Sequence, residues 1–131
     1  MILDSSFLID LLRDTRGRAA KKAEELDKRF VAKGVSSVTV LELWRGALRS
    51  NDVSSELKKI EELFQSLQIY PLGVEEAKKA AEIESNLLRH GELIDWEDIL
   101  IAGTAKAHNL PVLTKNVKHF SKIPDLSIET Y

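Results

Sequence analysis

Cysteine is absent from this chain, which excludes disulfide bonds, thiolate metal sites and a cysteine nucleophile. Any bound metal ion must therefore be held by oxygen or imidazole ligands. The six glycines are not clustered and no Gly-x-x-x-x-Gly-Lys-Ser/Thr run exists, so a P-loop nucleotide enzyme is disfavoured. No apolar run approaches membrane-spanning length, and Asp4 stands where a secretory signal needs a basic and then an apolar stretch. We expect a cytoplasmic protein with no membrane partner.

Net charge is also small, at -2, with an isoelectric point near 5.9. Attraction of the whole molecule to nucleic acid is therefore not expected, although a local basic rim remains open. The chain has 131 residues, of which 44% are hydrophobic and 31% charged, a composition that favours an ordered globular protein. We predict one domain over residues 1–131.

Short apolar segments alternate with helical patterns along the whole chain. The predicted strands end at Asp4 or lie at Val35–Val38, Ile69–Leu72, Pro111–Thr114 and Leu126–Ile128. The predicted helices follow Ser5, span Arg16–Lys33, begin at Thr39, begin at Ser54, and span Val74–Leu88 and Asp95–Ala107. This alternation predicts an α/β fold, with a mainly parallel central sheet flanked by helices on both faces.

Local signals place the ends of several helices. Gly34 is predicted to cap the helix over 16–33, whose apolar stripe includes Phe30. Thr39 is predicted to cap the next helix, with Glu42 as its partner in a capping box. A role in capping the helix would therefore explain Glu42 without any catalytic function.

Polar groups follow several of the predicted strands. They are Asp4, Glu42, Asp98 and the segment Thr114-Lys115-Asn116. Ligands of open α/β sheets bind outside the carboxyl ends of the strands, so these groups are expected to share one crevice. Clustered carboxylates repel one another unless a cation neutralises them, and Mg²⁺ or Mn²⁺ suits oxygen ligands. The hypothesis that follows is phosphodiester hydrolysis.

The structural alternative stays open for each acid, because Asp and Glu are favoured near helix N-termini whatever the protein does. Asp95 and Glu97 are typical helix-start acids. Asp98 is harder to explain in this way, since it borders a strongly apolar helix face.

Several segments, in this order, resemble the VapC-type PIN domain of toxin–antitoxin pairs. They are Met-Ile-Leu-Asp4-Ser-Ser, Ser-Val-Thr-Val-Leu-Glu42-Leu, Asp98-Ile-Leu-Ile-Ala-Gly-Thr-Ala and Leu-Thr114-Lys-Asn116-Val-Lys-His119-Phe120. The resemblance covers nearly the entire chain. It implies a PIN fold and a Mg²⁺- or Mn²⁺-dependent endoribonuclease that acts as a toxin on RNA. It also implies a homodimer, and a VapB-type antitoxin that inserts a segment near the active site.

Residue by residue, the resemblance makes Asp4 and Asp98 metal ligands and Glu42 a ligand or water-orienting base. Thr114 and Ser6 match polar residues that support the acidic pocket by hydrogen bonds.

The sequence departs from the family pattern at a fourth acid, where Asn116 and His119 stand instead. Asn116 is expected to bind a cation through its amide oxygen or to hold a bound water. The departure predicts weaker metal binding, and one tightly held ion rather than two. His119 is interpreted as a packing or surface residue in preference to a phosphate contact.

Basic and aromatic residues near the acids are candidate RNA contacts. The basic ones are Arg13, Arg45, Arg49, Lys115 and Lys118, each of which also fits a solvated helix face. Trp44 fits a core or dimer position better than a base-stacking one, and Trp96 fits either. The predicted dimer surface is the stripe Val40, Leu43, Trp44, Ala47 or the helix from Ser54.

Two rival functions follow from the same pattern. The first is a catalytically weakened PIN-like module that binds RNA or antitoxin without cleaving RNA. The second is a phosphatase of the haloacid dehalogenase type, which is disfavoured because Asp4 is followed by Ser5 and Ser6 rather than by an Asp-x-Asp motif.

Overall fold

A single five-stranded sheet runs through this computed structural model, which describes residues 1–131. The strands are β1 (Ile2–Leu3), β2 (Gly34–Ser36), β3 (Gln68–Tyr70), β4 (Val112–Leu113) and β5 (Ile128–Glu129). Their order across the sheet is β3-β2-β1-β4-β5, and every neighbouring pair is parallel. The helices are α1 (Ser5–Arg13), α2 (Arg18–Lys28), α3 (Ser37–Leu48), α4 (Val53–Phe64), α5 (Val74–Arg89), α6 (Trp96–Ala107) and α7 (Val117–Phe120).

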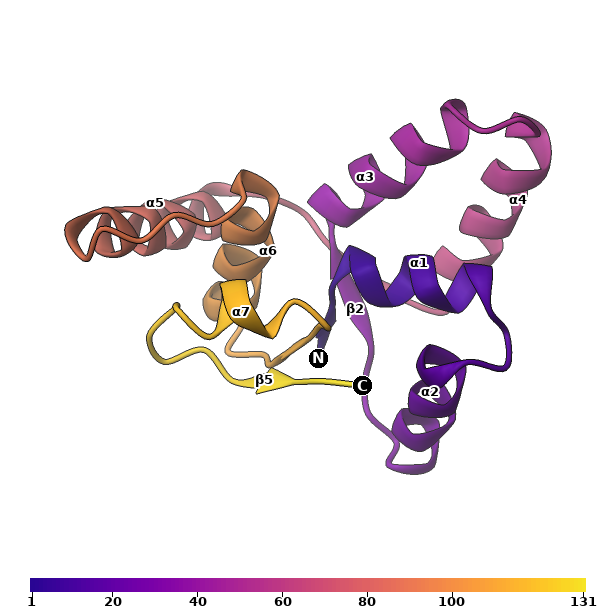
Figure 1. Cartoon of the computed structure of the whole chain (residues 1–131), viewed down its shortest axis with the longest axis horizontal. Coiled ribbons are helices and arrows are strands. Elements are labelled where there is room, and N and C mark those ends of the chain that lie inside the picture. Colours follow the sequence, from indigo (N-terminus) through magenta and orange to yellow (C-terminus); the bar gives the residue numbers. More distant parts are fainter.

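The central strand β1 divides the core into two parts. Successive side chains of a strand point to opposite faces, so Ile2 and Leu3 enter different clusters. Ile2 packs with buried residues of α5 and α6, whereas Leu3 packs with buried residues of α1 to α4. Figure 1 shows the corresponding arrangement, with α5, α6 and α7 on one side of the strands and α1 to α4 on the other. The predicted α/β fold with a parallel sheet and helices on both faces is confirmed.

Three local predictions are wrong. Gly34 lies in β2 and does not cap a helix, because α2 already ends at Lys28. Phe30 is 94% exposed and belongs to no core stripe. Thr39 does not cap α3. Ser36 does so instead, because its hydroxyl oxygen accepts a hydrogen bond from the backbone N–H of Val38 at 3.2 Å.

The connections that leave β1 define where a ligand site should lie. From β1 the chain passes to β2 and β3 on one side, while β4 and β5 lie on the other. The strand order therefore reverses between β1 and β4, and such a switch point opens a crevice at the carboxyl ends of the strands. Asp4 follows β1 directly and Thr114 follows β4 directly, so both lie at this crevice.

Gly103 sets the distance between α5 and α6. A Cβ at this position would lie 2.8 Å from the Ala80 backbone nitrogen and 2.8 Å from the Glu76 carbonyl oxygen. Since backbone atoms cannot move aside independently, Gly103→Ala is expected to lower the free energy of unfolding by about 1–3 kcal/mol. Urea denaturation followed by circular dichroism measures this change.

Gly46→Ala is the matched control, because nothing lies within 4 Å of a Cβ there. In the exposed turn of α3 this change should leave stability equal or raise it by about 0.5–1 kcal/mol. If the Gly103→Ala variant were as stable as the wild type, α5 and α6 could move apart enough to accept a methyl group at this contact.

Candidate active site

Asp4 is held rigidly at the end of β1. Its side chain is buried, with the residue only 2% exposed. The carboxylate oxygen Oδ2 accepts a hydrogen bond from Ser6 Oγ at 2.7 Å and another from Thr114 Oγ1 at 2.7 Å. The backbone N–H of Asp4 donates to the carbonyl oxygen of Leu113 at 2.9 Å. The adjacent strands β1 and β4 thus fix both the backbone and the side chain of this acid.

Asp98 enters the crevice from the first turn of α6 and is 8% exposed. Its Oδ2 accepts a hydrogen bond from Asn116 Nδ2 at 2.9 Å and lies 2.7 Å from His119 Nδ1. The backbone N–H of Asn116 donates to Thr114 Oγ1 at 2.8 Å, which links this group to the hydroxyl that holds Asp4. The segment after β4 therefore contacts both acids.

Glu42 projects from α3 and has no capping role, because that helix begins at Ser37 with Ser36 as its cap. Its Oε2 atom is buried and has no hydrogen-bond partner. Burial raises the pKa of Glu42, and the negative charges of Asp4, Glu97 and Asp98 raise it further, against a partial opposing effect of Ser5. The capping-box interpretation is wrong, and the isolated buried oxygen requires another explanation.

Burial also raises the pKa of Asp98, and the nearby charges of Asp4 and Asp95 add to this effect, while His119 opposes it. The charges of Asp4 and Asp98 thus both raise the pKa of Glu42, and the charge of Asp4 also raises the pKa of Asp98. The three acids that the sequence singled out are therefore near enough for their charges to interact.

The chemistry of this group fits a divalent cation. Its donors are carboxylate oxygens with an amide and an imidazole beside them, and one carboxylate oxygen is buried without a partner. Asp95, Asp98 and His119 can each offer one ligand atom, and these atoms lie within 4.8 Å of one another. Of the three predicted metal ligands, only Asp98 belongs to this group; Asp4 and Glu42 lie outside it.

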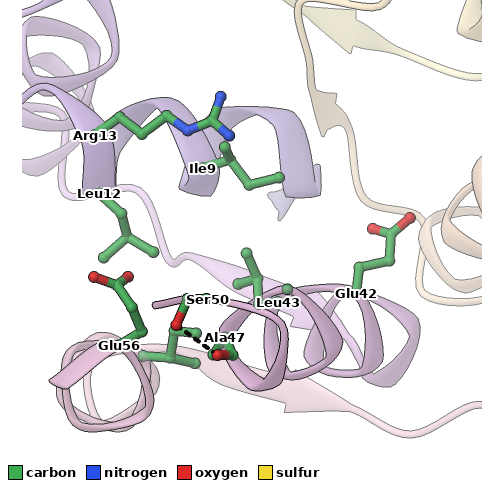
Figure 2. Close-up of a pocket in the computed structure, with 10 residues that line it drawn as sticks. Ile9, Leu12, Arg13, Glu42, Leu43, Ala47, Ser50 and Glu56 are labelled. Carbon is green, nitrogen blue, oxygen red and sulfur yellow. Dashed lines mark hydrogen bonds between the residues drawn. The ribbon is translucent and has the colours of Figure 1, made fainter. Parts of the chain in front are cut away.

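An apolar groove leads away from Glu42 between α1, α3 and α4. Figure 2 shows Ile9 and Leu12 of α1 facing Leu43 of α3 across it, with Glu42 towards one end and Glu56 at the other. Leu43 and Ala47 are buried within this chain, so the predicted stripe through Val40 and Trp44 does not present them as a free dimer surface. The exposed apolar residues of α3 are Leu41 and Leu48.

The predicted basic rim is only partly free. Arg13 is exposed beside the groove. Arg45 lies 3.9 Å from Glu97 and is about half exposed. Lys115 is paired with Asp10 at 2.8 Å.

The two tryptophans occupy different surroundings. Trp96 is 59% exposed, whereas Trp44 packs against the core cluster of α1 to α4.

Sequence reasoning missed one contact network beside the site. The Tyr131 hydroxyl donates to Asp10 Oδ2 at 2.9 Å, and its ring meets that of Phe7 edge to face with centroids 5.0 Å apart. This network fixes α1, the helix that follows Asp4. No local pattern indicates it, because its partners are 121 residues apart.

Glu42→Gln is expected to stabilise the metal-free protein at neutral pH. The pKa of Glu42 is higher in the folded state than its ordinary value of 4.5, so the folded state binds more protons than the unfolded state between these two values. The free energy of unfolding therefore falls as pH rises through that interval. The variant should gain up to about 1 kcal/mol above the interval, allowing for solvent screening, and nothing below it.

Thermal unfolding at several pH values in a chelating buffer measures this difference, with the exposed Glu61→Gln as control. A stability difference that does not change with pH would contradict the assigned cause.

The family model described as "PIN domain" matches residues 1–126. The chain therefore belongs to the PIN-domain family. Within that family it is 34% identical to the ribonuclease VapC of Rickettsia bellii (strain RML369-C), over 99% of this chain and 95% of the relative. It is 31% identical to the tRNA(fMet)-specific endonuclease VapC of Salmonella typhimurium, over 74% of each chain.

Solved structures show the same fold. VapBC2 from Rickettsia felis, bound to a DNA fragment from its promoter, matches with a TM-score of 0.91 at 25% identity, over 99% of this chain and 97% of that chain. DNA-bound VapBC from Salmonella typhimurium matches with a TM-score of 0.91 at 26% identity, over 98% and 96%. The resemblance to VapC-type PIN domains is confirmed. None of the helices is long and apolar enough to span a membrane.

Proposed function

We propose that this protein is a metal-dependent endoribonuclease and the toxin of a VapBC-type pair. The observation that carries the proposal is the electrostatic coupling of Asp4, Glu42 and Asp98 beside the switch point of the sheet. Membership of the PIN-domain family and similarity to VapC ribonucleases support the activity and its RNA substrate. The proposal extends over residues 1–131 as one catalytic domain.

Each of these residues has a separate proposed role in hydrolysis. Asp4 and Asp98 would hold a Mg²⁺ or Mn²⁺ ion, with Glu42 as a further ligand or as the base that orients the attacking water. When bound, the cation supplies charge stabilisation to the phosphodiester oxygens. Glu42 would act through its Oε2, which is buried and has no hydrogen-bond partner. Ser6 and Thr114 keep Asp4 in one orientation.

A partner antitoxin of the VapB type is proposed to occupy the groove between α1, α3 and α4. The solved relatives that share this fold are VapBC complexes, which supports such a partner. The groove is lined by Ile9, Leu12, Leu43 and Ile60 and reaches Glu42. An apolar segment placed there would end beside the acids and hinder the entry of RNA.

We also propose a homodimer, which is an expectation from the family, and a cytoplasmic location, where RNA and antitoxin are available. Exposed apolar residues such as Leu41 and Leu48 offer contact surface for a second copy. Light scattering on the purified chain tests the dimer, and a monomer mass at micromolar concentration would reject it.

The function is tested by incubating the purified protein with a mixed set of labelled RNAs that includes tRNAs. The proposal predicts internal cuts in the presence of Mg²⁺ or Mn²⁺. RNA binding without any cut would instead favour the weakened binding module, to which the missing fourth acid points.

A further inference from the structure

His119 lies inside the acidic group rather than on an open surface. It belongs to α7, a helix of 4 residues that begins directly after Asn116. Its side chain is 27% exposed, and Nδ1 lies 2.7 Å from Asp98 Oδ2 and 3.9 Å from Asp95 Oδ2. The helix α7 is held in place by Phe120, which is fully buried in the core. The position of the imidazole is therefore set by the fold.

With Asp98 ionised, the two contacts of Nδ1 conflict with each other. Asn116 Nδ2 lies 2.8 Å from Nδ1 and 2.9 Å from Asp98 Oδ2, so this amide can donate to both. If Nδ1 accepts from Asn116, its lone pair faces the lone pairs of ionised Asp98 Oδ2. If Nδ1 instead carries the proton and donates it to Asp98, it faces a second donor in Asn116. With Asp98 ionised and the Asn116 amide in this orientation, neither neutral tautomer satisfies both contacts.

A cation shared by Nδ1 and Oδ2 removes the conflict. The ring proton then lies on Nε2, Nδ1 offers its lone pair, and Asn116 continues to donate to Asp98. Ligands about 2.1 Å from an octahedral ion lie ~3 Å apart along an edge. The separation of 2.7 Å between Nδ1 and Oδ2 is close to that edge.

We propose that His119 is a metal ligand, and that its Nδ1 takes the place of the fourth acid of the family. The inference rests on the proposed function, because it concerns the same metal site. An imidazole ligand moves the selectivity of a site away from Mg²⁺ and towards transition-metal ions such as Mn²⁺. The ligand atoms that lie within 4.8 Å of one another are then two carboxylate oxygens, from Asp95 and Asp98, and one nitrogen, which distinguishes the site from an all-oxygen site.

The test uses Mn²⁺ alone as a paramagnetic probe on the intact chain. Pulsed electron paramagnetic resonance detects modulation by a directly bound ¹⁴N nucleus. The wild type is expected to show this modulation, and labelling histidine with ¹⁵N should change it. His119→Glu should bind Mn²⁺ without the modulation. His90→Gln, at the far end of α5, is the matched control and should keep it.

Competition between Mg²⁺ and Mn²⁺ in titration calorimetry gives a second readout. His119→Glu should reduce the preference for Mn²⁺ over Mg²⁺ by about 10-fold. An unchanged preference would count against nitrogen ligation.

The outcomes separate this inference from the function on which it rests. If Mn²⁺ binds and Asp98→Asn abolishes binding, but no ¹⁴N modulation appears, His119 is not a ligand and the proposed metal site stands. If Mn²⁺ does not bind, or binds equally well to Asp98→Asn, the metal site itself is wrong and the inference falls with it.

Discussion

Asp98→Asn is expected to slow RNA cleavage at least about 100-fold. The substitution keeps the size of the side chain and one of its oxygens, but it removes the negative charge that is needed to hold a cation. The carboxylate lies in the first turn of α6 and is 8% exposed, so water cannot replace it easily. Single-turnover cleavage of a labelled RNA measures the rate.

The fold should survive this change. Burial raises the pKa of Asp98, so its charge costs stability in the metal-free protein, and the neutral amide should unfold at an equal or higher temperature. Asp125→Asn is the matched control, because Asp125 is exposed and lies in a left-handed turn (φ 57) that asparagine also accepts. Cleavage by Asp98→Asn at the wild-type rate would remove Asp98 from the metal site.

Gly46→Trp is expected to weaken binding of the cognate VapB-type antitoxin at least about 30-fold. Gly46 lines the groove on α3, between Leu43 and Ala47 of the same wall. No atom lies within 4 Å of a Cβ there, so the large side chain can be accepted by the helix while occupying groove space. Surface plasmon resonance with immobilised antitoxin measures the affinity.

Gly46→Ala provides the control, since it adds one methyl group and keeps the groove open. Its affinity should stay within about 3-fold of the wild type. If the tryptophan variant bound the antitoxin as tightly as the wild type, the groove would not be the antitoxin site.

The sequence was sufficient for the fold class because the fold class depends on local patterns. Apolar segments such as Met1–Leu3 and Val112–Leu113 are short and buried on both faces, as strands of a parallel sheet require. Asp4 and Asp98 were recognisable because each stands at the border of such an apolar segment.

The wrong predictions depend on contacts between distant segments. The sequence predicts Gly34 as a helix cap, but this residue lies in β2, where it pairs with Ile2 of β1 and Gln68 of β3. The residues Ser36, Ser37 and Thr39 are all good caps, and the pairing of β2 with β3 decides that Ser36 is used.

The environment of His119 was also beyond the sequence. The helix α7 has 4 residues, which is too short for a periodic signal, and the contact with Asp98 joins residues 21 apart. Phe120, the next residue, packs in the core with Ile2 and Val112, and this packing places the imidazole near the acids.

The most direct test of the central claim is whether RNA cleavage requires a bound divalent cation. The purified chain, stripped with EDTA, is incubated with labelled RNA before and after Mg²⁺ or Mn²⁺ is restored, beside Asp4→Ala. The account predicts no cleavage without metal, internal cuts when metal is restored, and no cuts by the variant. Cleavage that persists in EDTA, or that the variant retains, would contradict it.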